Sequence, residues 1–330
     1  MAPFFLSDIL RIPPPTLTEK NLPSQAGRVF IVTGGYDGIG LKLSSILYSH
    51  DGTVYIAGRN RAKGTAAIEA VRAEFPSSKG RLEFILVDFA DLRTIKPAAE
   101  SFLARETRLD VLTNNAGVVN VPVGSVSTQG HELHMATNVL GPFLFTKLLL
   151  PVLRATAATA PPGSVRVTWA ASLSSDMDSP PNGITFDADG SPVRHAQVAA
   201  NYAQSKTANI FLASELARRF PAAETHIMTN AWHPGILRTK AVGEQPWLLR
   251  KLLDATIFHE PIYGAYTLLY AGWAEETGRP ENNGRYVAPW GRLRRNRKDI
   301  EEARKSKAEA GPGTAEMLWE WCERETRAFA

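Results

Sequence analysis

Apolar residues along this chain form two kinds of run, one continuous and short, the other longer and with helical spacing. The continuous runs lie at residues 28–33, 53–57, 82–87, 109–113 and 164–171. Such runs, the first of which is mostly β-branched, are typical of parallel strands covered on both faces. The longer runs predict helices at 41–48, 131–150 and 201–220.

The regular alternation of strand and helix predicts an α/β fold, a doubly wound parallel sheet of the Rossmann type with helices on both faces. We assign residues 27–298 to this single three-layer α/β/α domain. Residues 1–26 form an N-terminal arm, and residues 299–330 form a C-terminal helical extension. Ligands bind such a sheet at the carboxyl ends of its strands.

A glycine-rich turn joins the first strand to the first helix. It reads Gly34-Gly35-Tyr36-Asp37-Gly38-Ile39-Gly40. Gly34 allows the tight turn, Gly38 lets the backbone approach a pyrophosphate, and Gly40 allows close packing of the helix. Because the first amides of that helix face the phosphates, the whole turn is predicted to bind a dinucleotide.

The end of the second strand bears on the choice of cofactor. A carboxylate there would accept hydrogen bonds from a ribose 2′-hydroxyl, whereas an arginine accommodates a 2′-phosphate. Arg59 stands at this position, with Lys63 nearby, so NADP(H) is expected. Asp37 adds a negative charge to the adjoining turn, so NAD stays an alternative, and Arg59 could also be a solvated surface charge.

The third and fourth strands end in polar and small residues. Asp88 either accepts a hydrogen bond from the adenine amino group or caps the next helix. Asn114 could tie the central strands together. After it, small residues would let a cofactor lie close to the strand end; they are Asn115, Ala116 and Gly117.

The segment Asn201-Tyr202-Ala203-Gln204-Ser205-Lys206 opens an amphipathic helix. Tyr202 and Lys206 are four positions apart and therefore project from one face. A phenol has a pKa near 10, and a neighbouring ammonium favours the phenolate and lowers that pKa. The pair is therefore a candidate proton donor or acceptor for a carbonyl or an alcohol.

Two further polar residues occupy unusual or well-placed positions. Asn138 lies inside a predicted helix with a glycine three positions on, which is a local cost. The cost is either simply tolerated or reflects a kink that frees a backbone carbonyl for water. Ser172 follows the fifth strand at its carboxyl end.

Taken together, these segments resemble the classical short-chain dehydrogenase/reductase superfamily over roughly residues 27–290. The matching pieces, in order, are the turn 33–40, Asn114-Asn115-Ala116-Gly117, Asn138, Ser172, Tyr202-x-x-x-Lys206 and Pro234-Gly235. The resemblance implies that Tyr202 is the general acid/base and that Lys206 lowers its pKa and binds the nicotinamide ribose. It also implies that Ser172 holds the substrate oxygen and Asn138 anchors a proton-relay water. Pro234 and Gly235 would meet the nicotinamide, and Thr239 would contact its carboxamide.

Within that superfamily the chain looks most like retinol-dehydrogenase-like and fungal alcohol-dehydrogenase-like members. Thirty positions separate Ser172 from Tyr202, and the intervening segment 176–197 reads as an ordered insertion loop. Residues 236–262 are expected to include a substrate lid, with Trp247 and Leu248 as pocket walls. The sequence departs from the usual pattern at Ala171, where a second serine is common, and in the turn at Tyr36 and Asp37.

Composition adds mainly exclusions. The 330 residues carry a net charge of +4, and the basic cluster at 292–298 reads as a solvated helix start, so no nucleic-acid partner is expected. Cys322 is the single cysteine, which excludes an internal disulfide and a cysteine-built metal site and fits a cytoplasmic location. No segment is expected to span a bilayer and no metal is expected. The apolar arm either packs on the domain or makes a weak membrane or partner contact.

The sequence therefore predicts an NADP(H)-dependent carbonyl reductase or alcohol dehydrogenase acting on a small lipophilic ketone, aldehyde or secondary-metabolite intermediate. Self-association into a homo-oligomer is compatible with the sequence. The alternatives are an NAD-dependent alcohol dehydrogenase and a non-catalytic dinucleotide-binding regulatory protein. Four potential catalytic residues in one chain argue against the last of these.

Overall fold

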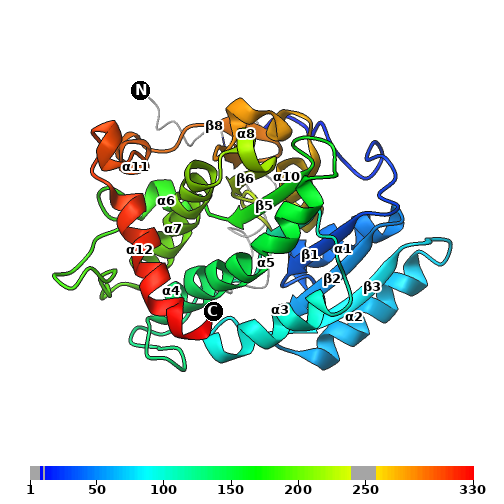
Figure 1. Ribbon diagram of the computed structural model, residues 1–330, viewed down its shortest axis with the longest axis horizontal. Helices are drawn as coiled ribbons and strands as arrows, with labels where there is room; N and C mark the ends of the chain where they lie inside the picture. The colour runs from blue at the N-terminus through cyan, green and yellow to red at the C-terminus, as the bar shows by residue number, and fades with distance from the viewer. Residues whose placement is uncertain (1–7, 10–11, 239–257) are drawn as a thin grey trace, which may run out of the picture.

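The computed structural model describes residues 8–9, 12–238 and 258–330 (Figure 1). A sheet runs through the middle of the molecule in the strand order β3-β2-β1-β4-β5-β6-β7-β8. Strands β1 to β7 pair in parallel, and β8 is antiparallel to β7. The strands are β1 Val29–Thr33, β2 Thr53–Gly58, β3 Arg81–Leu86, β4 Val111–Asn114, β5 Val165–Ala170, β6 Ile227–Trp232, β7 Tyr286–Ala288 and β8 Arg292–Arg294. The predicted doubly wound sheet is confirmed.

Helices cover both faces of this sheet. The helices are α1 Gly38–Ser49, α2 Arg61–Glu74, α3 Ile95–Leu103, α4 Leu133–Met135, α5 Gly141–Ala157, α6 Ser174–Met177, α7 Val198–Arg219, α8 Ala222–Thr225, α10 Pro261–Trp273, α11 Lys298–Ala303 and α12 Thr314–Thr326. Successive side chains of a strand point to opposite faces. In β1, Ile31 therefore packs with α3, α5 and α7, whereas Phe30 and Val32 pack with α1 and α10.

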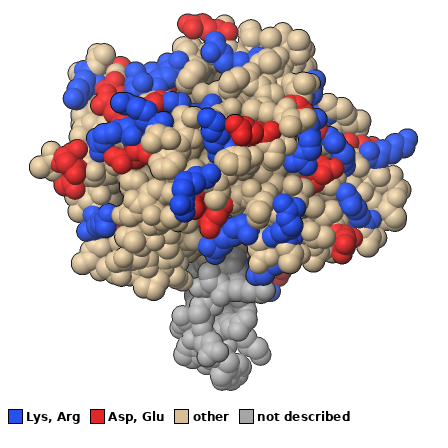
Figure 2. Space-filling model, turned by 60° about the horizontal axis from the view of Figure 1, so that its bottom comes forward, with Lys and Arg blue, Asp and Glu red and all other residues tan. Residues whose placement is uncertain are grey.

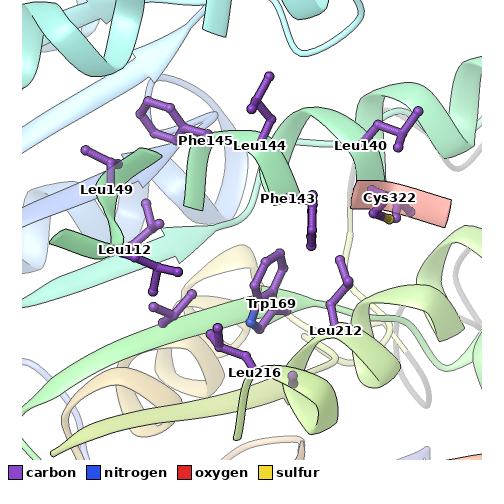
Figure 3. Packing of buried hydrophobic residues seen from close by; sticks show 14 of the residues in the cluster. Leu112, Leu140, Phe143, Leu144, Phe145, Leu149, Trp169, Leu212, Leu216 and Cys322 are labelled. Atoms are coloured by element: carbon purple, nitrogen blue, oxygen red, sulfur yellow. The ribbon is translucent and has the colours of Figure 1, made fainter. Parts of the chain in front are cut away.

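The core on the α5 side is built from large apolar side chains of several elements. Figure 3 shows Phe143 of α5, Trp169 of β5 and Leu212 of α7 pointing toward one another. Trp169 and Phe143 are almost fully buried. The sequence around Tyr202 folds as a helix because its apolar side chains enter this core, which fixes one face of α7 against the sheet.

The sequence predicted no membrane-spanning segment, and one described helix, Leu133–Ala157, is long and apolar enough to cross a membrane by length and composition alone. Its apolar window is 83% buried inside the fold. It therefore occupies the position of a core helix, and its apolar length reflects packing on two sides.

The C-terminal extension packs on the domain through α12, which lies beside α7 (Figure 1). Trp319 stacks edge-on to Phe143 with ring centroids 4.9 Å apart, and the Arg219 guanidinium lies 5.0 Å from the Trp319 ring. Trp319 and Trp321 are both buried, so they are packing anchors. Cys322 is also buried, against the α5 and α7 core.

The sequence predicted that the basic segment 292–298 is a solvated helix start. The structure contradicts this prediction. The first three residues of the segment form the edge strand β8, and α11 begins only at Lys298. The Arg294 side chain is 10% exposed and ion-paired to Asp8 and Asp176. The prediction failed because charged residues usually face solvent, and their buried acidic partners lie far away in the sequence.

The described part of the N-terminal arm packs on the domain. Asp8, a polar residue within the apolar pattern, is fully buried, while Ile9 is half-buried.

On the face shown in Figure 2, basic and acidic side chains are interspersed. The net charge of +4 therefore does not form a single basic patch on that face.

Candidate active site

The first turns of α7 place Tyr202 and Lys206 at the carboxyl end of β5. Tyr202 is half-buried and Lys206 is buried. The Lys206 ammonium donates to the backbone oxygen of Ala170, the last residue of β5, at 3.1 Å. It lies 5.6 Å from the centroid of the Tyr202 ring. The two side chains therefore share one helix face, as their spacing predicts.

The electrostatics of this pair differ from the expectation. Burial raises the pKa of the Tyr202 phenol, and a hydrogen bond with the Ser172 side chain only partly opposes that effect. Burial also lowers the pKa of Lys206 to about 8. The expected lowering of the tyrosine pKa is not found, because the Lys206 ammonium donates to a backbone carbonyl and burial has the largest effect on the phenol.

Ser172 stands two residues beyond the end of β5. Its hydroxyl acts to lower the pKa of the nearby Tyr202 phenol and accepts a hydrogen bond from the backbone amide of Ser174 at 3.2 Å. Because α6 begins at Ser174, the first amide of that helix orients the hydroxyl. Two hydroxyl groups thus converge at the strand end, where a substrate oxygen could lie between them.

Asn138 lies in a π-helical turn, Ala136–Leu140, between α4 and α5. Its amide nitrogen donates to the Val118 backbone oxygen at 3.1 Å and to the Ser205 hydroxyl at 2.9 Å. Its amide oxygen accepts from the Val118 backbone amide at 2.8 Å. The asparagine and nearby glycine that are unfavourable in an ordinary helix lie in or beside this π-helical turn. The turn lets the Asn138 side chain connect α7 to the loop after β4.

A close approach at Gly117 brings these groups together. A Cβ atom at Gly117 would lie 2.9 Å from the Asn138 amide oxygen and 3.2 Å from the Lys206 ammonium. Asn138, Lys206 and the loop after β4 therefore meet at a point where a side chain would not fit. The structure brings all four predicted catalytic residues to the carboxyl ends of neighbouring strands.

The glycine turn after β1 has the geometry its sequence predicts. Gly34 has φ +66°, and a Cβ atom at Gly40 would lie 2.6 Å from the Gly34 backbone oxygen. Gly38 begins α1, and the Asp37 carboxylate caps that helix by accepting from the Gly38 amide at 2.8 Å. The negative charge of Asp37 was expected to disfavour binding of NADP(H), but its carboxylate is hydrogen-bonded within the turn.

The two asparagines at the end of β4, Asn114 and Asn115, have different roles from those expected. Asn115, not Asn114, ties the central strands, because its side chain donates to the Thr33 backbone oxygen at 2.8 Å. The Thr33 hydroxyl accepts from the Asn115 and Ala116 amides. Asn114 is buried and donates to Thr146 of α5 at 3.0 Å. Adjacent residues at a strand end point to opposite sides, and the sequence alone does not say which side faces the neighbouring strand.

A cavity of about 400 Å³ lies between the ends of β1, β2, β3 and β4. The predicted cofactor residues that line it are Gly34, Tyr36, Asp37, Arg59, Asp88, Asn115, Ala116 and Gly117. Asn60, Lys63, Val118 and Thr137 also line it. A larger cleft of about 1210 Å³ lies beside α7, α8 and α11, but none of the predicted site residues lines it.

Arg59 and Asp88 face this cavity in different ways. Arg59 is exposed and, among the described residues, forms no hydrogen bond or ion pair, so its guanidinium can meet an anion. The Asp88 carboxylate accepts from the Ala90 amide at 3.0 Å. The helix that follows is capped by Asp91, so the capping alternative for Asp88 is wrong.

The segment after β6 faces the glycine turn. A Cβ atom at Gly264 of α10 would lie 2.7 Å from Ile39 and 3.4 Å from Pro234. Ile39 and Pro234, both predicted to contact the cofactor, therefore lie close together on either side of Gly264. Gly235 has φ +83°, and a Cβ there would lie 3.3 Å from Pro289 and Trp290. Thr239, Trp247 and Leu248 lie outside the described residues, as does most of the expected lid, 236–262.

Known proteins share this sequence and fold. Residues 28–165 match the sequence model of the family described as short chain dehydrogenase. A short-chain dehydrogenase/reductase of Phomopsis amygdali is 40% identical over 324 residues, which cover 96% of this chain and 94% of that protein. The chain belongs to the short-chain dehydrogenase/reductase family.

Other relatives of this short-chain dehydrogenase/reductase are also fungal. The short-chain dehydrogenase/reductase pkfC of Emericella nidulans is 41% identical over 318 residues, 96% of this chain and 98% of that protein.

Among solved structures, the NADP active-site complex of Pseudomonas aeruginosa RhlG is 25% identical with a TM-score of 0.61, covering 80% of this chain and 95% of that chain. A blue fluorescent protein from a metagenomic library, in complex with NADPH, is 25% identical with a TM-score of 0.60, covering 81% and 98%.

Sequence analysis missed one group of residues beside the site of this dehydrogenase/reductase. Tyr286 of β7 is fully buried and donates its hydroxyl to the Ser172 backbone oxygen at 3.4 Å. Its ring stacks on His233, which directly precedes Pro234. A tyrosine in a three-residue strand carries no sequence signal, although a histidine beside a cofactor-facing Pro-Gly pair could have raised the question.

Proposed function

We propose that this protein reduces a carbonyl compound, or oxidises the corresponding alcohol, by hydride transfer with NADP(H). The observation that carries the proposal is the grouping of the Ser172 hydroxyl, the Tyr202 phenol and the Lys206 ammonium: Ser172 acts to lower the pKa of Tyr202, and the ammonium lies 5.6 Å from the centroid of the Tyr202 ring. The three groups stand at the end of β5, next to a cavity framed by the glycine turn. Membership in an oxidoreductase family supports the same reaction class.

The residues of the cavity fit a dinucleotide. Gly34 and Gly117 line it, and neither position has room for a side chain, since a Cβ atom at either would come within 3.2 Å of a neighbouring protein atom. The helix α1 begins at Gly38, directly after the cavity-lining Asp37, so the amides of its first turn would be available to the cofactor phosphates. Bound there, the cofactor would supply or accept the hydride, while Pro234 and Gly235 would lie at its nicotinamide end.

The chain's own groups would handle the oxygen of the substrate. Tyr202, whose raised pKa keeps it protonated at neutral pH, donates a proton to that oxygen in the reductive direction. Ser172 donates a hydrogen bond to the oxygen and stabilises its developing negative charge. Lys206 keeps a positive charge near Tyr202 and holds the cofactor ribose, and Asn138 holds the loop after β4 in register with α7 and anchors a proton-relay water.

The substrate class follows from the reaction and from sequence. We propose a small lipophilic ketone, aldehyde or secondary-metabolite intermediate, because the segment after the nicotinamide contact is apolar, with Pro246-Trp247-Leu248-Leu249 and Leu252-Leu253. The test is NADPH oxidation over benzaldehyde, decanal, acetophenone and cyclohexanone, each repeated with NADH and with NADP⁺ plus the matching alcohol. The absence of cofactor turnover with every compound, in both directions, would favour a non-catalytic dinucleotide-binding protein.

Cofactor preference should depend on Arg59. A guanidinium binds a phosphate in bidentate fashion, and hydrogen bonds to charged groups contribute about 1.5–3 kcal/mol. We therefore expect the wild-type protein to bind NADPH about 10- to 100-fold more tightly than NADH. Arg59→Asp should remove most of that preference, as measured by the dissociation constants of both cofactors at one fixed salt concentration.

Arg61 offers a matched control for that measurement. It lies two positions further on, in the first turn of α2, and its guanidinium lies 5.6 Å from the Phe84 ring. Because it does not line the cavity, Arg61→Asp should leave the NADPH preference largely intact. Equal binding of NADH and NADPH by the wild type, or equal effects of the two substitutions, would identify Arg59 as a surface charge and favour the NAD-dependent alternative.

A further inference from the structure

We propose that Asp8, in the N-terminal arm, is a positioning residue for this active site. Through His233, Arg294 and Tyr286 it fixes the two backbone segments that carry Ser172 and Gly235. The inference rests on the proposed function, because it assigns a role in the geometry of the same site. It adds the N-terminal arm to a site otherwise built at the ends of the central strands.

Asp8 lies at the centre of a buried polar cluster. Its side chain is fully buried, and its carboxylate accepts from Arg294 Nε at 2.6 Å and from Arg292 Nη2 at 2.9 Å. Burial acts to raise the pKa of the Asp8 carboxyl, but the hydrogen bond with His233 and the two guanidinium charges outweigh it and lower that pKa. The carboxylate is therefore a buried anion whose partners are fixed in place around it.

The first connection runs to the nicotinamide end of the site. His233 Nδ1 accepts from the Gly235 backbone amide at 3.2 Å, so the ring proton of the neutral histidine must be on Nε2. That nitrogen lies 3.2 Å from the Asp8 carboxylate and donates to it. Burial lowers the pKa of His233, which favours this neutral form. Asp8 thus sets both the tautomer and the orientation of the ring that holds Gly235.

The second connection runs to Ser172. Arg294 bridges Asp8 and Asp176, donating from Nη2 to the Asp176 carboxylate at 2.6 Å. Asp176 lies in α6, the short helix that begins two residues after Ser172. The same guanidinium lies 4.8 Å from the Tyr286 ring. Tyr286 in turn donates to the Ser172 backbone oxygen at 3.4 Å.

The two connections close on each other, because Tyr286 stacks on His233 with ring centroids 5.8 Å apart and an interplanar angle of 25°. A change at Asp8 therefore reaches the Ser172 segment and the Gly235 segment at the same time. Replacing the carboxylate by an amide removes the negative charge and one of the two acceptor oxygens that His233 and the two arginines share, where the Asp8 side chain is fully buried. The rings and the two backbone segments they hold would then shift, and catalysis is sensitive to shifts of about 1 Å.

The first experiment needs no substrate. Amide hydrogen exchange, read by mass spectrometry, is compared between the full-length wild type and Asp8→Asn. We expect faster exchange in residues 171–177 and 233–236. The matched control is Glu323→Gln, which breaks another ion pair that tethers a terminal segment, the one between Glu323 of α12 and Lys147 of α5 at 2.6 Å. That control should leave both regions unchanged. Unchanged exchange in both regions of Asp8→Asn would overturn the proposal.

The second experiment measures catalysis per folded molecule. The kcat of Asp8→Asn is normalised to sites counted by NADPH fluorescence titration, with the most active of benzaldehyde, decanal, acetophenone and cyclohexanone as substrate. We expect kcat to fall about 10- to 100-fold, with the KM for NADPH little changed and a larger isotope effect from 4-deuterated NADPH. A residue that only stabilised the fold would lower the number of sites and the melting temperature but not this kcat.

Tyr286→Phe gives an independent reading if Asp8→Asn does not fold. It removes only the hydroxyl that meets the Ser172 segment, so exchange should rise in residues 171–177 and not in 233–236. Equal exchange in wild type and Tyr286→Phe would overturn the Ser172 connection. Failure of the proposed function itself would show differently, as full turnover in Tyr202→Phe whatever the result at Asp8.

Discussion

Replacing Tyr202 by phenylalanine should lower turnover by about 10²–10⁴-fold, the range that general acid–base catalysis typically contributes. The substitution removes the transferable proton of the site and keeps the ring, which packs near the Lys206 ammonium and edge-on to His134. NADPH affinity should stay within a few-fold of wild type, because the cavity at the ends of β1 to β4 does not include Tyr202. Steady-state kinetics and fluorescence titration measure the two quantities.

The matching control is Tyr48→Phe, at a buried tyrosine of α1, which should keep wild-type turnover. Near-normal turnover in Tyr202→Phe would contradict the assigned mechanism.

The pH dependence of reductive turnover provides a second test of the mechanism. Reduction needs a protonated Tyr202, and its raised pKa keeps it protonated through neutral pH. Lys206 loses its proton as the pH rises through about 8, so reductive turnover should be flat below that pH and fall above it.

Ser172→Ala should lower kcat by about 10²–10³-fold, because an oxyanion-type donor contributes roughly 2.7–4 kcal/mol in comparable sites. The hydroxyl is positioned by the Ser174 amide, so its hydrogen bond to the substrate oxygen would be formed with little reorganisation. The KM for the carbonyl substrate should change less than kcat, because this hydrogen bond strengthens as negative charge develops on the oxygen.

Ser174→Ala is the neighbouring comparison. It keeps the backbone amide that orients Ser172 and removes only a buried hydroxyl for which no partner is found among the described residues. Its kcat should therefore remain close to wild type. If the two serine variants lost activity equally, Ser172 would have a structural role at the start of α6 and no special part in the reaction.

The elements that the sequence predicted well are those whose physics is local. A strand buried on both faces needs a continuous apolar run, and a turn that passes a helix start close to a strand needs glycine. Both requirements are visible in the segment from Val29 to Gly40. The four-residue spacing of Tyr202 and Lys206 is equally local, because the period of a helix fixes which side chains share a face.

What the sequence could not give depends on contacts between distant segments. Asp8 and Arg294 are 286 positions apart, and no periodicity connects a carboxylate in an apolar arm to a strand of arginines. The direction of the Tyr202 pKa was missed for a related reason. It is set by how much protein surrounds the phenol and by where the Lys206 ammonium points, and both are known only once the chain is folded.

The burial of the lone cysteine makes the C-terminal helix directly observable. Cys322 is fully enclosed between α12 and the core, and burial raises the pKa of its thiol well above the ordinary value. The thiolate is the reactive form, so a thiol reagent can modify Cys322 only when α12 separates from the domain. The labelling rate at neutral pH therefore follows the opening equilibrium of that helix. Without any engineered residue, the chain can report how firmly its last segment is held during turnover.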